Sequence, residues 1–159
     1  MPHVMITGSS SGLGFALAQR FMSKDWTVTG TTHDVKMLTE GDEHRLFYNA
    51  LDEAAHLKVR QSMRDHGIER VDVLINNAGI NAIRKFEDLT LDFMEDVMRV
   101  NCHAPVLLIR ELLAAGMFST PPLSVTIISD AAWRPMRHSE AYGTSKAAFD
   151  MATRQMARE

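Results

Sequence analysis

Residues 7–14 read TGSSSGLG, between the apolar run His3–Thr7 and the segment Leu13–Lys24, whose apolar residues recur at helical spacing. This order predicts a strand, a tight turn and a helix. Two templates fit the turn: a glycine-rich loop that holds the phosphates of a dinucleotide, and a G-x-S-x-G turn that presents Ser10 as a hydrolase nucleophile. The hydrolase template needs strands and an oxyanion loop upstream, yet only seven residues precede Gly8. The phosphate loop is therefore favoured.

Strands and helices are expected to alternate along the rest of the chain. Val71–Ile75 is an unbroken apolar run, which is typical of a strand buried on both faces and so of a parallel sheet. The pattern predicts a single α/β domain over residues 1–159, with a doubly wound, Rossmann-like parallel sheet that binds ligands beyond the carboxyl ends of its strands. Further strands are expected at Trp26–Thr32, Arg45–Asn49 and Ser124–Ser129, a loop at His33–His44, and helices at Glu53–His66 (capped by Asp52, closed by Gly67), Thr90–Ala115 (stopped by Gly116) and Ser139–Glu159.

The composition excludes several classes of partner. With 45% hydrophobic residues, 23% charged residues and a net charge of -3, the chain gives no electrostatic reason to expect a nucleic acid or an anionic membrane as partner. No window approaches the ~18 apolar residues of a membrane span, and MPHVMITG does not resemble a signal peptide. The single cysteine, Cys102, fits a reducing compartment, so we expect a cytoplasmic protein. The seven histidines lack metal-binding spacing, so no metal is expected.

Three further polar features fall near expected strand ends. The stretch INNAG (75–79) follows the apolar strand, and YGTSK (142–146) lies near the start of the last helix. Residues four apart share a helix face, so the Lys146 ammonium can lie near the Tyr142 phenol and favour the phenolate. Ser129 ends the preceding strand and could donate to a carbonyl oxygen while Tyr142 transfers a proton. Singly, each feature also fits an ordinary structural role: a turn without a ligand, turn-capping asparagines or serine, or an incidental Tyr–Lys pair.

Together and in this order, the motifs resemble those of the classical short-chain dehydrogenase/reductase family. TGSSSGLG matches that family's TG-x-x-x-G-x-G, NNAG matches unaltered, Ser129 with YGTSK matches the catalytic serine and Y-x-x-x-K, and Asn101 matches a structural asparagine. The resemblance covers the whole chain. It implies that Tyr142 is the general acid/base, that Ser129 orients the substrate oxygen and that Lys146 holds the nicotinamide ribose. Asn101, a poor residue for a helix interior, would disturb its helix and help to hold a water in the proton relay.

The resemblance also implies a dinucleotide cofactor and the residues that hold it. The adenosine and pyrophosphate would be surrounded by Gly8, Ser10, Ser11 and Leu13. The cofactor cleft would be lined by Asn77, Ala78 and Gly79, with Tyr142 and Lys146 at its nicotinamide end.

The choice between NADP and NAD rests on a few positions at the ends of strands. Thr32 stands where NAD-preferring members usually carry an acid, and His33 stands where NADP-preferring members often have arginine, so NADP is favoured over NAD. Asp34 lies next door, and Ser11 occupies a position that is basic in many NADP users, so the opposite preference stays open. Asn49 stands where the family usually has an aspartate beside the adenine, although an amide can make similar hydrogen bonds.

The expected function is an NAD(P)H-dependent oxidoreductase that moves a hydride between the cofactor and a small-molecule carbonyl or alcohol. The alternative is a non-catalytic dinucleotide-binding protein, or a truncated relic, because family members continue well past Y-x-x-x-K with further strands and a substrate lid. If the sheet order is the family's, Ser124–Ser129 is an edge strand. The long helix and the final helix resemble the family's dimer interface, so we expect a homodimer. In the loop Asp130–Glu140, Trp133 and Met136 could contact an apolar substrate and Arg134 or Arg137 an anion; an ordinary exposed loop is the alternative.

Overall fold

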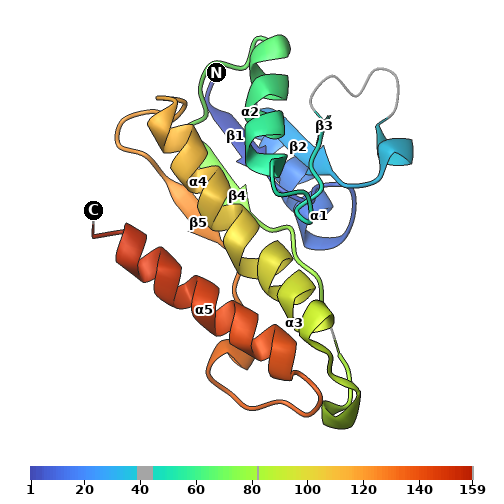
Figure 1. Cartoon of the computed structure of the whole chain (residues 1–159). Helices are drawn as coiled ribbons and strands as arrows, with labels where there is room; N and C mark the ends of the chain where they lie inside the picture. Colours follow the sequence, from blue (N-terminus) through green and yellow to red (C-terminus); the bar gives the residue numbers. More distant parts are fainter. Residues whose placement is uncertain (39–44, 82, 159) are drawn as a thin grey trace.

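The computed structural model describes residues 1–38, 45–81 and 83–158 (Figure 1). Strands and helices alternate, as the sequence predicts. The strands are β1 (His3–Ile6), β2 (Thr27–Thr32), β3 (Arg45–Phe47), β4 (Val73–Asn76) and β5 (Ser124–Thr126). The α-helices are α1 (Gly12–Met22), α2 (Ala55–Asp65), α3 (Leu91–Met98), α4 (Ala104–Ala114) and α5 (Glu140–Met156). Within the described residues, no helix is both long and apolar enough to cross a bilayer.

All the strands pair in parallel, in the order β3-β2-β1-β4-β5. The central strand β1 pairs on both sides, so that Met5 lies opposite Thr29 of β2 and Leu74 of β4. The chain turns outward from β1 in one direction to β2 and β3, and then returns to β4 on the other side. This reversal places a crevice at the carboxyl end of β1, which is where doubly wound sheets bind ligands. The expected fold class is confirmed, and β5 lies at an edge as expected.

Helices cover both faces of the sheet. Val4 packs in the apolar cluster that includes Ala18 of α1, while the next residue, Met5, packs in the cluster that includes Val59 of α2 and Leu108 of α4. Because side chains alternate along a strand, β1 serves both layers at once. Burial of each such large apolar side chain contributes about 1.5–3 kcal/mol. Figure 1 shows α4 and α5 running side by side along one face.

The long helix expected at Thr90–Ala115 is one continuous helical run with a wider turn in its middle. The Thr90 hydroxyl accepts the Phe93 N–H at 3.3 Å, which confirms the expected cap, and Gly116 follows the run with a φ of +66°. Between α3 and α4, residues 99–103 form a π-helical turn that contains Asn101. Such turns are rare in proteins, and those that occur often lie at functional sites.

Several element ends differ from those expected. Helix α2 starts at Ala55, two residues late, because the Asp52 carboxylate accepts the Ala54 N–H and holds a preceding turn. Strand β5 stops at Thr126 rather than Ser129, because Ser129 already caps a short 3-10 turn at Asp130–Ala132. Helix α5 stops at Met156, and Glu159 lies outside the described residues. The expected loop 33–44 contains one 3-10 turn, Val35–Met37, and its residues 39–44 also lie outside the described part.

Candidate active site

The glycine-rich turn packs so closely on the NNAG segment that side chains would not fit there. Gly8 has a φ of +68°, and a Cβ on it would lie 3.0 Å from the Cα of Ala78. A Cβ on Gly14 would lie 2.2 Å from the Gly8 carbonyl oxygen and 2.5 Å from Nδ2 of Asn77. Glycine at these two positions therefore lets the turn before α1 pack closely against the NNAG segment. The helix cap, Ser11, makes no side-chain hydrogen bond to the first turn, which leaves N–H groups of that turn available to an anion.

Thr7 and Asn77 bind this turn to the end of β4. The Thr7 hydroxyl accepts the N–H groups of Asn77 and Ala78, both at 3.0 Å, and the Asn77 side-chain amide donates to the carbonyls of Thr7 and Gly8, also at 3.0 Å. The side chain of Asn77 thus holds the backbone of the glycine-rich turn in place. Sequence reasoning missed Thr7, although it stands inside the quoted motif.

A cavity of about 260 Å³ opens beside this turn, at the carboxyl ends of β1, β2, β3 and β4. The cavity is lined by these residues that were expected to hold a cofactor: Gly8, His33, Asn49, Ala78 and Gly79. Ser10, Ser11 and Leu13 do not line this cavity, and Leu13 is exposed. The remaining wall is formed by Thr31, Thr32, Tyr48, Ala50, Leu51, Ile80 and Val100.

The end of β2 is organised by local hydrogen bonds. The Thr32 hydroxyl accepts the Asp34 N–H at 3.2 Å, and Oδ1 of Asp34 accepts the Lys36 N–H at 2.9 Å. The Asp34 carboxylate therefore caps the 3-10 turn that follows the strand. In this segment, Thr32 and the exposed residue His33 both border the cavity.

Asn101 joins the segment after β4 to α5. Its Oδ1 accepts the Ile80 N–H at 2.8 Å, while its Nδ2 donates to the Ile80 carbonyl and to the Ser145 hydroxyl, both at 3.0 Å. The side chain is buried, and the π turn brings it to this position. Ser145 was not singled out from the sequence, because its link to Asn101 is a tertiary contact across 44 positions.

Lys146 lies beside Asn101 in the same buried region. A Cβ on Gly79 would lie 3.1 Å from Oδ1 of Asn101 and 3.5 Å from Nζ of Lys146, so Gly79 leaves space between the two. The Lys146 side chain is 5% exposed, and its Nζ donates to the Ile127 carbonyl at 2.9 Å and lies 5.9 Å from the ring centroid of Tyr142. Desolvation by burial lowers the pKa of Lys146.

Tyr142 and Ser129 stand on adjoining turns. Tyr142 is half-buried in the first turn of α5, and Ser129 is half-buried at the start of the 3-10 turn, where its Oγ accepts the Ala131 N–H at 3.2 Å. A Cβ on Gly143 would lie 2.8 Å from the Ala131 carbonyl, so this glycine allows α5 to pack against the 3-10 turn. The two hydroxyl groups make no hydrogen bond with each other in the described structure. Each is positioned by its own turn.

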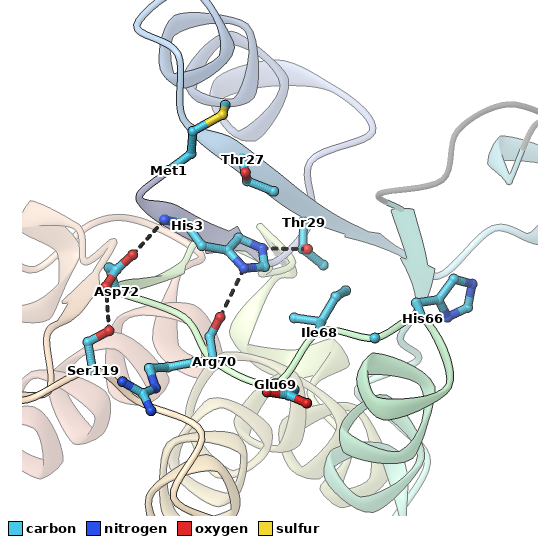
Figure 2. Close-up of a pocket in the computed structure, with 11 residues that line it drawn as sticks. Met1, His3, Thr27, Thr29, His66, Ile68, Glu69, Arg70, Asp72 and Ser119 are labelled. Atoms are coloured by element: carbon cyan, nitrogen blue, oxygen red, sulfur yellow. Dashed lines mark hydrogen bonds between the residues drawn. The ribbon is translucent and has the colours of Figure 1, made fainter.

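A larger hollow, of about 730 Å³, lies at the amino ends of the strands (Figure 2). Nε2 of His3 lies 2.8 Å from the Thr29 hydroxyl, and Nδ1 lies 2.9 Å from the Arg70 carbonyl. Asp72 accepts hydrogen bonds from Ser119 and from the His3 backbone N–H, which lower the pKa of its carboxyl. These bonds join the starts of strands, whereas the motif residues gather at the carboxyl edge. Size alone therefore does not select the site.

Comparisons with known proteins agree with this geometry. The family model described as short chain dehydrogenase matches residues 2–159. Benzil reductase ((S)-benzoin forming) of Bacillus subtilis is 35% identical over 94% of this chain, and serine 3-dehydrogenase of Agrobacterium fabrum is 26% identical over 91% of it. A short chain dehydrogenase from Burkholderia cenocepacia, solved in complex with NADP, superposes with a TM-score of 0.84 at 27% identity and covers 99% of this chain.

The relatives are longer than this chain. It spans 64% of the Bacillus protein, 60% of the Agrobacterium protein and 67% of the Burkholderia chain. The match nevertheless runs across nearly every residue of this chain, through the glycine turn, NNAG and YGTSK alike. The chain therefore belongs to the short chain dehydrogenase family.

Proposed function

We propose that this chain is an NAD(P)-dependent oxidoreductase that interconverts a small-molecule carbonyl and the corresponding alcohol. The observation that carries the proposal is the convergence of Lys146, Asn101 and Gly79 at the carboxyl edge of the sheet, on the same crevice as the glycine turn. One end of a dinucleotide would reach this cluster, and the other would reach the cavity beside His33 and Asn49. A bound dinucleotide would therefore contact both the Lys146 cluster and the cavity beside His33 and Asn49.

The residues present fit a dinucleotide. At Gly8 and Gly14, side chains would fill the space that the close backbone approach requires, and the uncapped start of α1 offers N–H groups to a pyrophosphate. Ala78 and Gly79 line the crevice with small residues, which leaves space for the cofactor. The Lys146 ammonium can hold ribose hydroxyl groups near Tyr142. A bound nicotinamide would supply or take up the hydride.

The protein's own groups would handle the proton. Tyr142 is the proposed general acid/base, which gives a proton to the carbonyl oxygen in reduction and removes it in oxidation. Ser129 is proposed to donate a hydrogen bond to the same oxygen and so fix its position. Lys146, buried and positively charged when protonated, stabilises negative charge on the phenol oxygen. Asn101 keeps α5 in register with the segment after β4 through its bonds to Ile80 and Ser145.

The proposed cofactor is NADP in preference to NAD. An NAD-selective site needs a carboxylate at the end of β2 to accept the ribose hydroxyl groups. Here that position is Thr32, and Oδ1 of the nearby Asp34 is used by the Lys36 N–H. His33 borders the cavity, where its ring N–H would donate a hydrogen bond to a 2′-phosphate. The NADP complex of the Burkholderia relative supports the same choice.

Turnover tests the catalytic part of the proposal. NADPH oxidation would be followed with a panel of ketones that includes benzil, and NADP reduction with serine, because two relatives act on these compounds. Tyr142→Phe is expected to lower kcat about 10²–10⁴-fold and to leave the NADPH Kd nearly unchanged. Thr144→Ala, which alters an exposed hydroxyl on the same helix, serves as the matched control.

The second candidate is a dinucleotide-binding protein without catalysis. It would share the glycine turn and the cavity beside His33 with the first candidate, and the two differ only in turnover. In that case NADPH would bind, no compound in the panel would be turned over, and Tyr142→Phe would change nothing. Turnover that depends on the Tyr142 hydroxyl excludes this candidate.

A homodimer is also proposed, formed through α4 and α5. Both helices carry exposed apolar side chains, Leu113 at 48% and Met151 at 56% exposure. Sedimentation equilibrium is expected to give twice the chain mass, and a mass of one chain over the micromolar range would contradict it.

A further inference from the structure

Ser129 and Tyr142 lie on two separate pieces of backbone, and the packing of these pieces sets the distance between their hydroxyl groups. Ser129 caps the 3-10 turn at Asp130–Ala132, whereas Tyr142 lies in the first turn of α5. The two pieces touch where the Ala131 carbonyl faces the backbone of Gly143. Because Gly143 directly follows Tyr142, this contact joins the backbone beside the tyrosine to the turn that carries the serine.

The 3-10 turn moves as one unit with Ser129. The Ala131 N–H donates to the Ser129 Oγ at 3.2 Å, and the Ala132 N–H donates to the Ser129 carbonyl at 3.0 Å. A shift of the Ala131 carbonyl would therefore move Ser129 with it. The hydrogen bond that the Ser129 hydroxyl donates to Oδ1 of Asp130 is long, at 3.4 Å, so a substrate oxygen would compete well for the same hydrogen.

Helix α5 is anchored beside Tyr142 by buried side chains. The Ser145 hydroxyl donates to the Tyr142 carbonyl at 2.7 Å and accepts from Nδ2 of Asn101 at 3.0 Å. Ser145 and Asn101 are both buried, whereas the 3-10 turn leads directly into the exposed residues 133–137. A group inserted between α5 and the turn would therefore displace the turn rather than the helix.

Gly143 provides the space that this contact needs. A Cβ on Gly143 would lie 2.8 Å from the Ala131 carbonyl oxygen, whereas ordinary contacts begin at 3.4 Å, so a methyl group would push the turn away by about 0.6 Å. The Gly143 N–H donates to the Ser139 carbonyl at 2.7 Å, which keeps the helix backbone from rotating the Cβ away.

We propose that Gly143 is a positioning residue, which sets the separation of the Ser129 and Tyr142 hydroxyl groups by letting the turn rest directly on the backbone of α5. The inference rests on the proposed function, in which both hydroxyl groups contact the same substrate oxygen. A misplacement of about 1 Å can cost about 10²-fold in rate, so the smaller shift caused by a methyl group is expected to cost about tenfold. A change at Gly143 alters neither hydroxyl group, so the loss would come from their geometry.

The experiment is a double-mutant cycle on the 159-residue chain, with kcat measured for the ketone of the panel that the wild type reduces fastest. Ser129→Ala is expected to lower kcat about 10²-fold, as the loss of one donor to a reacting oxygen does. Gly143→Ala is expected to lower kcat about tenfold and to leave the Kd for NADPH nearly unchanged. In the Gly143→Ala chain the Ser129 hydroxyl is already displaced, so Ser129→Ala is expected to cost only about tenfold more.

Thr144→Ala is the matched control. It raises helix propensity at the adjacent exposed position, as Gly143→Ala does, and adds no group against the turn. The Thr144→Ala chain is expected to keep the wild-type kcat and the full effect of Ser129→Ala. Circular dichroism and NADPH binding verify that every variant is folded, which is expected for Gly143→Ala because alanine favours a helix more than glycine does.

Three results would overturn the inference: a Gly143→Ala chain with the wild-type kcat, a Ser129→Ala effect that is equally large with glycine and with alanine at position 143, and a Gly143→Ala chain that does not fold. The last would show that Gly143 is needed for the fold rather than for the separation of the hydroxyl groups. All three leave the proposed function standing, because the wild type still reduces the ketone. If a folded wild-type chain reduces no ketone of the panel, the proposed function fails and this inference fails with it.

Discussion

Lys146 couples the site to stability because an ammonium group is buried there. Burial lowers its pKa below the ordinary value of 10.5, so between these two pKa values the unfolded chain binds more protons than the folded chain. The free energy of unfolding contributed by this residue therefore rises with pH across that interval. We expect the wild type to gain stability relative to Lys146→Met as the pH rises from neutral toward 10.5, measured by urea unfolding. A difference that does not change with pH would contradict the buried, desolvated ammonium.

Gly14 gives a prediction whose sign opposes helix propensity. In the first turn of a helix, alanine is ordinarily about 1 kcal/mol better than glycine. Here a Cβ would lie 2.2 Å from the Gly8 carbonyl, and that atom belongs to the backbone of the turn. Gly14→Ala is expected to lower the free energy of unfolding by about 1–3 kcal/mol and to weaken NADPH binding.

The control for Gly14 is Ala16→Gly, on the exposed side of the same helix. This change should cost about 1 kcal/mol through propensity alone and leave the Kd for NADPH as it was. A Gly14→Ala chain that is more stable than the wild type would show that the turn is not tightly packed.

At the scale of elements, an ion pair joins α2 to α4. Glu111 is buried, with Oε1 2.5 Å from Nη1 of Arg60 and Oε2 3.1 Å from Nη2 of Arg110. Removing one member of a buried pair leaves the other charge uncompensated. Glu111→Gln is expected to lower the free energy of unfolding by about 2 kcal/mol, since Arg60 retains some access to solvent.

The pair Arg154–Asp150 on α5, in which Arg154 is exposed and Asp150 is half-buried, provides the comparison. Asp150→Asn is expected to cost less than about 0.5 kcal/mol, because water screens an ion pair whose arginine lies in solvent. Chemical denaturation of both variants at one ionic strength gives the two values. Equal losses would mean that burial does not govern the Glu111 contact.

The helix containing Asn101 illustrates how far the sequence could predict the site. Its caps at Thr90 and Gly116 follow from local chemistry, and both are confirmed. That Asn101 disturbs its helix was expected from propensity and from the family resemblance, and residues 99–103 are indeed π-helical. Its bonds to Ile80 and Ser145 depend on how three separate segments pack, and no local pattern encodes that packing.

For the whole molecule, hydrophobic patterning and turn residues predicted the parallel sheet and the alternation of elements. Strands β1 and β4 are short, mainly apolar runs followed by turn residues, and β2 and β5 are rich in valine and threonine. Strand ends were less predictable. Ser129 looks like the end of a β-branched strand, but its side chain caps the next turn, so β5 stops at Thr126. The cavity beside His33 and Asn49 also depends on the sheet order, since the end of β3 lies next to β2, and the end of β2 next to β1, only in the folded chain.

We propose that the crevice at the carboxyl edge of the sheet binds a nicotinamide dinucleotide. The most direct measurement titrates the 159-residue chain with NADPH and, separately, with NADH, following nicotinamide fluorescence while circular dichroism reports that the chain is folded. Saturable binding of both nucleotides is expected, with the lower Kd for NADPH. A folded chain that binds neither nucleotide would contradict it.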